Sequence, residues 1–236
     1  MNSQLDALAQ QLTANCGASG SALIQRAEDA SLPQILWLEH SRAHALTGVA
    51  DELIDGALSA IRESAVCIAL GLVRPALGAM RVQIDLSLGW LYFRKHELEW
   101  NRVQTSGEGF KLKSDVIKYL EEHLPEFKFR SGLLKKRRTR QIEDPYRLLS
   151  AHIHAQSLNT LPVMIKPESI VGSEESQQQA IQMLSECSEY VSDLYWSCFG
   201  GQWYGLPEAL RAPLESRLIA PQERSSFFNG HEPANA

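Results

Sequence analysis

The chain has 236 residues, of which 44% are hydrophobic, and a formal net charge of −5. This composition suits a globular protein with a core, and the negative charge excludes a chain that coats nucleic acid through its overall charge. The N-terminal sequence lacks the basic start and apolar core of a signal peptide. The longest apolar run, AVCIALGLVRPALGAM, is interrupted by Arg74 and Pro75 and is too short to cross a bilayer. We therefore expect a cytoplasmic protein with no membrane partner.

The four cysteines form no CxxC pair, and we expect them to be reduced thiols. They are Cys16, Cys67, Cys187 and Cys198.

The first region, residues 1–30, is expected to hold a short helix and a flexible linker. Leu5, Leu8 and Leu12 have the spacing of a short amphipathic helix, and NCGASGSA after them predicts a flexible break.

Residues 31–205 are expected to form the helical bundle. SLPQILWLEHSRAHAL begins with Ser31 as a cap and Pro33 in the first turn, which predicts the start of a helix. Two long segments with apolar residues three, four or seven apart follow, and they predict the core helices. The apolar positions are Leu53, Ala57, Ile61 and Ile68, and then Leu77, Met80, Ile84, Leu88, Leu91 and Leu98.

The second half of the bundle continues this pattern. KSDVIKYLEEHL predicts a helix that ends before Pro125, and a basic segment follows it. Asp144 and Pro145 are typical of a helix cap and first turn. SEESQ, which starts at Ser173, opens the last long helix. Residues 206–236 are expected to form a short helix and a tail that is disordered from about Pro221. The fold prediction is an all-α bundle of about five or six main helices.

The segment DPYRLLSAHIHAQSL carries the candidate catalytic residues. At 100° per residue, Arg147, Ser150 and His154 share one polar face of the predicted helix, whereas His152 points sideways. A histidine transfers protons near neutral pH, and a guanidinium stabilises charge on phosphate oxygens. Since the 2′-hydroxyl of RNA can act as the nucleophile, such a face can cleave RNA without a metal.

Arg147 with His152 or His154 resembles the Arg-x(4–6)-His motif of the HEPN superfamily of helical bundles. RPALGAMRVQIDLSLGWLYF and YRLLSAHIHA are also similar to segments of HEPN-like proteins from bacterial mobile elements. The resemblance covers roughly residues 53–199. It implies a metal-independent endoribonuclease of a defence or toxin–antitoxin system, which acts as a homodimer with a composite site. The residue after the arginine is often polar in that family, but here it is Leu148.

A basic strip in the 128–140 segment is the candidate contact for RNA or another nucleic acid, because clustered positive side chains bind phosphates. The alternatives are a solvated loop or a strip that docks on an acidic partner. Phe127 and Phe129 either stack on bases or anchor the segment in the core. The strip consists of Lys128, Arg130, Lys135, Lys136, Arg137, Arg138 and Arg140.

Two further clusters have open interpretations. His40 and His44 lie one helical turn apart, a spacing that can hold zinc, but no third ligand is visible and surface or core histidines are the favoured interpretation. We therefore expect no metal and no cofactor. The aromatic residues of DLYWSCFGGQWYG indicate either a helix end packed on the core or a protein interface.

The leading hypothesis is a HEPN-like RNA-binding protein and endoribonuclease. His154 would act as general base or acid, Arg147 would stabilise the phosphate, and Ser150 would orient the substrate or the histidine. The alternative is a non-catalytic interaction subunit, built on the same bundle, that binds a partner protein or nucleic acid. Leu148 slightly favours this alternative.

Overall fold

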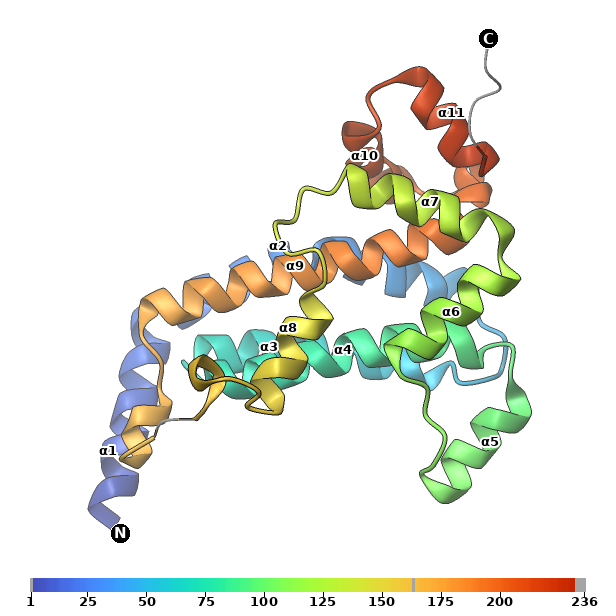
Figure 1. The fold of residues 1–236 in the computed structure, drawn as a ribbon. Coiled ribbons are helices and arrows are strands. Elements are labelled where there is room, and N and C mark those ends of the chain that lie inside the picture. Colours follow the sequence, from blue (N-terminus) through green and yellow to red (C-terminus); the bar gives the residue numbers. More distant parts are fainter. Residues whose placement is uncertain (1, 163, 232–236) are drawn as a thin grey trace. The chain divides into compact units, whose positions relative to one another are not determined.

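The computed structural model describes residues 2–162 and 164–231, and every regular element in these ranges is helical. The all-α class is therefore confirmed for the described chain, although its helices outnumber the five or six expected. The longest helices are α2 (Ser21–His44), α3 (Glu52–Ala69), α4 (Val73–Phe93) and α9 (Glu174–Phe199) (Figure 1). The shorter α-helices are α1 (Asn2–Asn15), α5 (Glu97–Ser106), α6 (Lys113–His123), α7 (Pro125–Lys136), α8 (Pro145–Ile153), α10 (Glu208–Arg217) and α11 (Pro221–Asn229).

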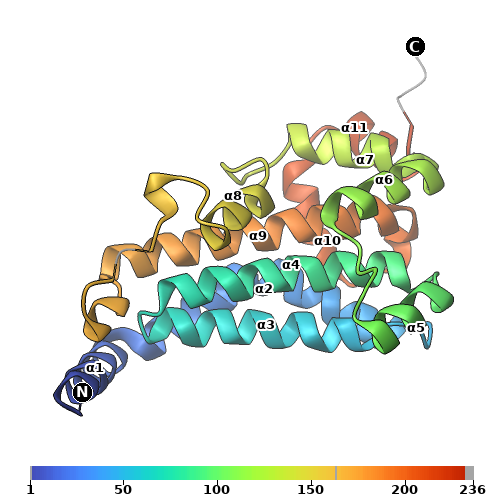
Figure 2. The same cartoon turned by 60° about the horizontal axis from the view of Figure 1, so that its bottom comes forward.

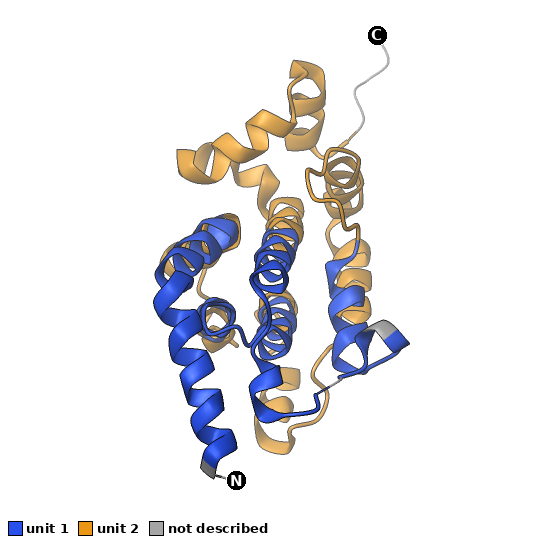
Figure 3. Cartoon of the chain, turned by 90° about the vertical axis from the view of Figure 1, so that its left-hand side faces the viewer, with its two compact units in different colours: residues 1–32, 56–84, 144–188 blue, residues 33–55, 85–143, 189–236 orange. Residues whose placement is uncertain are grey.

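The chain divides into two compact units, each assembled from segments that are far apart in the sequence (Figure 3). Unit 1 comprises residues 1–32, 56–84 and 144–188, and unit 2 comprises residues 33–55, 85–143 and 189–236. Each of α2, α3, α4 and α9 contributes residues to both units.

The core of unit 1 is aliphatic. Small residues such as Ala57 and Ala65 allow the helix backbones to approach, and larger side chains fill the remaining space. The buried side chains include Leu23, Leu58, Ile61, Ile68, Met80, Ile84, Leu149 and Leu184. The turn between α3 and α4 needs Gly71, whose φ of +78° favours glycine and whose carbonyl accepts from the Gly172 amide at 2.8 Å.

The core of unit 2 is aromatic. Trp37 packs edge-on against Trp196, with ring centroids 4.9 Å apart, and Trp90 stacks on Tyr195 at 5.9 Å. Such pairs add to the stabilisation gained from buried apolar area. Trp203 is also buried, whereas Tyr204 is 97% exposed. Most of the aromatic side chains of DLYWSCFGGQWYG are therefore buried in the core, which agrees with the interpretation of this segment as a helix end packed on the core.

The predicted break near residue 20 is wrong. A π-helical turn, Cys16–Gly20, connects α1 to α2, so α2 begins at Ser21 and contains Pro33 in its interior. Ser31 is not a cap, because it is fully buried and its hydroxyl donates to the Ala27 carbonyl at 2.8 Å. Gly20 is buried in this turn, which explains why a glycine-rich stretch can remain helical.

The predicted apolar stripe of the fourth helix is confirmed over most of its length. Met80, Ile84, Leu88 and Leu91 are buried. Leu98 is wrongly assigned, because α4 ends at Phe93 and Leu98 lies in α5, where it is 86% exposed. A periodic pattern cannot show that a short turn has rotated the next helix.

Three other expectations concern the second half of the chain. The long helix at Ser173 is confirmed as α9, and the Ser173 hydroxyl accepts from the Ser176 amide at 3.3 Å. A solvated loop was one of the alternatives for the basic segment, and its first part is helix α7. The expected disordered tail contains α11, and its Phe227 is fully buried. Residues 232–236 of that tail lie outside the described residues.

Candidate functional site

Helix α8 of unit 1 carries the candidate catalytic residues, and its sequence defines both of its ends. The Asp144 side chain accepts from the Arg147 amide at 3.2 Å, and Pro145 occupies the first turn, as predicted. The helix ends at Ile153, and the His154 amide still donates to the Ser150 carbonyl at 3.0 Å. Ala155 then adopts a φ of 49°, which terminates the helical path.

Arg147 and His154 are the exposed polar residues of this helix. Both side chains lie in solvent, and neither makes a hydrogen bond or an ion pair with another described residue. Seven residues separate them, which corresponds to a rise of about 10 Å along the helix axis. The two groups are therefore available to a ligand but are not in contact with each other.

Ser150 is engaged by a residue that the sequence interpretation missed. The Nε of Arg81, on α4, donates to the Ser150 Oγ at 3.1 Å. The ribbons of α4 and α8 are labelled in Figure 2. The same guanidinium is hydrogen-bonded to the Tyr146 hydroxyl and lies 3.4 Å from the centroid of the Tyr146 ring. Burial lowers the pKa of Arg81, while Tyr146 and Asp144 act in the opposite direction.

Arg74, two turns before Arg81 on the same face of α4, holds the end of the candidate segment. Its Nη2 donates to the His152 carbonyl at 2.9 Å and its Nη1 donates to the Thr160 carbonyl at 3.0 Å. These two carbonyls bracket His154 in the sequence. His152 is half-buried, and burial together with the charge of Arg74 lowers its pKa.

Arg74 and Arg81 have a signal in the sequence. They are seven residues apart in a largely apolar helix, so they share one face. Charged residues at such spacing on a core helix indicate a polar partner on the neighbouring element, and here that partner is α8.

The basic strip does not present all of its members to solvent. Arg130 is buried and donates to the Phe227 and Phe228 carbonyls at 2.9 and 3.0 Å. Arg140 is also buried and pairs with Asp193. These two guanidinium groups stabilise unit 2 and are not positioned to contact a phosphate. Phe127 is buried as well, which favours its reading as a core anchor.

The other five members of the strip are exposed. Lys135 pairs with Glu143, and Arg137 pairs with Glu223 at 2.8 Å. The Arg138 Nη1 donates to the Lys135 carbonyl at 2.9 Å. Lys128 and Lys136 have no ion pair with another described residue. The exposed part of the strip therefore has fewer basic side chains than the sequence suggests, and two of them are paired with carboxylates.

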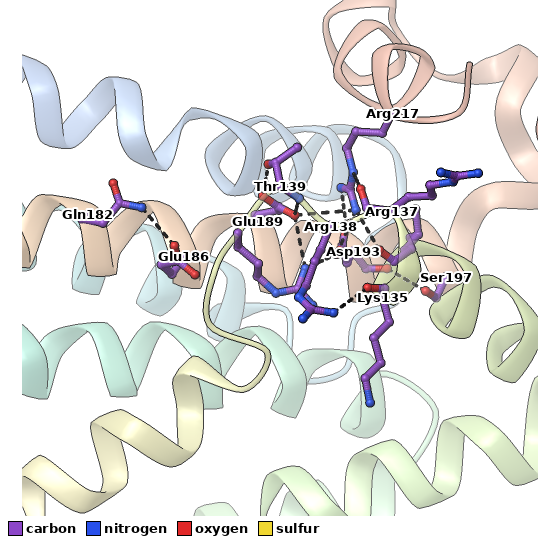
Figure 4. A network of polar contacts seen from close by, with 12 residues as sticks. Lys135, Arg137, Arg138, Thr139, Gln182, Glu186, Glu189, Asp193, Ser197 and Arg217 are labelled. Carbon is purple, nitrogen blue, oxygen red and sulfur yellow. Dashed lines mark hydrogen bonds and ion pairs between the residues drawn. The ribbon is translucent and has the colours of Figure 1, made fainter. Parts of the chain in front are cut away.

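A buried ion network lies where α9 and α10 meet the end of the strip, within unit 2 (Figure 4). Asp193 accepts from the Arg217 Nη1 at 2.6 Å and also from Arg140. Glu189 accepts from the Thr139 amide at 2.8 Å and lies 3.3 Å from the Arg140 Nη1. Two arginines and two carboxylates balance each other, so this network is structural.

His40 and His44 line a pocket of about 280 Å³ in unit 2. Their ring centroids lie 4.9 Å apart, and the other lining residues are Gln202, Gly205 and Leu206. Burial and the neighbouring His44 lower the pKa of His40. Among the residues that the structure describes, no group of three or more His, Cys, Asp or Glu side chains is arranged to hold a metal ion.

Comparisons with known proteins gave no match to a family model, a curated protein or a solved structure. Within the described part of the chain, no helix has both the length and the apolar character needed to cross a membrane.

Proposed function

We propose that this chain is a HEPN-like RNA-binding protein that contacts RNA through the exposed face of α8. The observation that carries the proposal is that Arg147 and His154 are both exposed. The segment that carries them is held by hydrogen bonds from Arg74 and Arg81 of α4. Helix α8 contains no acidic residue, and Asp144 before it is used as the cap. Three arginines around a short helix favour an anionic ligand.

Cleavage of the bound RNA is the activity that we assign to this face. His154 removes the proton of the 2′-hydroxyl, and the 2′-oxygen attacks the adjacent phosphorus. The bond to the 5′-oxygen breaks, and protonation of this oxygen gives a 2′,3′-cyclic phosphate and a 5′-hydroxyl. Arg147 stabilises the added negative charge on the phosphate oxygens. Ser150 accepts from Arg81 and retains its own proton to donate to the substrate.

The rise of about 10 Å between Arg147 and His154 supports a homodimer as the active form. A single phosphate contacts both groups of one helix only if the long arginine side chain extends along α8. A second protomer can instead supply one member of the pair. Lys128, Lys136 and Arg138 are the strip residues that we assign to binding the RNA backbone.

The test is cleavage of a mixed RNA pool by the wild type and by Arg147→Ala and His154→Ala, in the presence of EDTA. Arg62→Ala is the matched control, because Arg62 is an exposed arginine of unit 1 without an ion pair to another described residue. We expect both site variants to lose cleavage by about 100-fold or more, as for removal of a general base or a charge stabiliser. RNA binding by the same proteins is measured in parallel.

A non-catalytic interaction subunit is the second candidate function, and one observation favours it. The His154 ring has no described partner that would orient it, whereas catalytic histidines are commonly oriented by a third group. RNA binding that Arg147→Ala weakens, without cleavage by the wild type, would support this candidate. If the wild type neither binds nor cleaves RNA, the assignment of α8 to RNA is overturned.

A further inference from the structure

We propose that His40 and His44 form a binding site for one divalent late transition-metal ion of the Ni²⁺, Cu²⁺ or Zn²⁺ type. The site lies in unit 2 and does not depend on the proposed action on RNA. Imidazole nitrogen is a preferred ligand of these ions, and histidines at positions i and i+4 lie on one face of a helix.

The distance between the two rings fits chelation of one ion. A metal–nitrogen bond of about 2.0–2.1 Å puts the imidazole centroid about 3.2 Å from the metal. When the nitrogen–metal–nitrogen angle lies between about 90° (square-planar) and about 109° (tetrahedral), the two ring centroids are about 4.5–5.2 Å apart. The rings of His40 and His44 are 4.9 Å apart and inclined by 47°. The observed separation lies within the expected interval, so little rearrangement is needed.

The two rings are also free to bind. Neither His40 nor His44 makes a hydrogen bond with another described residue through a ring nitrogen. By contrast, the Nδ1 atoms of His96 and His123 are hydrogen-bonded to the Tyr92 and Tyr119 carbonyls at 2.7 and 3.0 Å. Glu39, next to His40, is engaged by Arg42 and does not compete for the rings.

Packing fixes one ring in place. His40 is half-buried, and its ring lies edge-on to Trp37 at a centroid distance of 6.2 Å. Trp37 is buried in the aromatic core, so the position of His40 is set before any ion arrives. This preorganisation lowers the entropy lost on binding.

The pocket leaves coordination positions open. Two histidines supply fewer ligands than a structural zinc site, which has four protein ligands. The amide oxygen of Gln202, which lines the same pocket, can supply one further ligand, and water can complete the shell. A site of this kind has an open coordination position that accepts an exchangeable ligand, as catalytic metal sites do. It differs in this from a closed structural metal site.

The experiment is isothermal titration of the full-length chain, free of any histidine tag, with NiCl₂ and separately with CuCl₂. We expect one ion per chain, with Cu²⁺ bound more tightly than Ni²⁺. His44→Ala should weaken binding by about tenfold or more, because loss of a direct ligand costs at least as much as loss of an outer-shell partner. His44 is exposed, so this substitution spares the core.

His40→Gln is the second test variant, and the double variant His96→Ala/His123→Ala is the control for adventitious binding to other histidines. Both test variants should lose affinity while the control keeps it. In the wild type, substoichiometric Cu²⁺ should broaden the ring proton signals of His40 and His44 before those of other histidines. Unchanged Ni²⁺ affinity in His44→Ala, or equal loss in the control, would overturn the proposal.

Discussion

The Nε of Arg81 donates to the Oγ of Ser150 at 3.1 Å, across 69 residues of sequence. The same guanidinium stacks over the ring of Tyr146, so one charged side chain contacts two successive turns of α8. Only Pro145 and Leu149 of α8 are buried, which leaves a short helix with little apolar anchoring. Arg81 therefore contributes to the orientation of α8 in unit 1.

Substitution Arg81→Ala should reduce the free energy of unfolding by about 1–3 kcal/mol, because it removes the hydrogen bonds from Arg81 to the Tyr146 and Ser150 hydroxyls. Arg81→Lys should recover little, since an ammonium group lacks the planar fork that stacks on Tyr146. Urea denaturation measures both values. Arg62→Ala is the control and should change stability by less than about 0.5 kcal/mol. Equal effects of Arg81→Ala and the control would contradict this role.

Removal of Arg74 should raise the pKa of His152. In the folded wild type, burial and the charge of Arg74 lower that pKa below 6.5, its ordinary value. The unfolded chain thus binds a proton more readily, and His152 contributes stability that is present above pH 6.5 and lost as the pH falls through its folded pKa. NMR titration of the ring protons in wild type and Arg74→Ala measures the shift. A lower pKa in the variant would be inconsistent with this account.

Asp193→Ala should be among the most destabilising substitutions in unit 2. It leaves Arg140 and Arg217 to share Glu189 as their remaining carboxylate, and removal of one partner from a buried ion pair costs about 3–5 kcal/mol. Asp55→Ala is the matched control, because Asp55 is largely exposed and its pair with Arg42 is weak. Thermal unfolding compares the two. A loss below about 1 kcal/mol for Asp193→Ala would mean that the network relaxes or admits water.

Mixing Arg147→Ala with His154→Ala should restore RNA cleavage if the site is shared between two protomers. Each variant alone lacks one essential group in every site. A mixed dimer contains one composite site with both groups intact, so activity should rise from background to about a quarter of the wild-type value at random pairing. Co-refolding at equal amounts, followed by the cleavage assay, measures this. Active wild type without recovery in the mixture would place both groups in one protomer.

The elements that the sequence predicts correctly have strong local signals. Asp144 and Pro145 define the start of α8, and Ser173 defines the start of α9, because caps and first-turn prolines act within a few residues. The break expected at Gly17 to Gly20 fails for the opposite reason. Tertiary burial of Gly20 outweighs the low helix propensity of glycine, and no local pattern encodes that burial.

The site residues also divide into those whose surroundings follow from the local sequence and those whose surroundings depend on distant partners. The exposure of Arg147 follows from its place on an amphipathic helix, but the partners of Arg130 and Arg140 lie about 50 to 100 residues away in the sequence. A run of basic residues has the same appearance whether its members meet solvent or buried acceptors. Only the fold separates Lys128 and Lys136 from the arginines that hold unit 2 together.

The carbonyls that receive the Arg130 guanidinium belong to Phe227 and Phe228, close to the end of the chain. Arg217, another late residue, neutralises Asp193 and donates to the Leu134 carbonyl at 3.2 Å. On the ribosome, α7 and the end of α9 therefore emerge well before the groups that satisfy their buried charges. Unit 2 can complete its packing only after α10 and α11 have been synthesised, so a nascent chain that lacks them exposes an incompletely paired surface to chaperones and proteases.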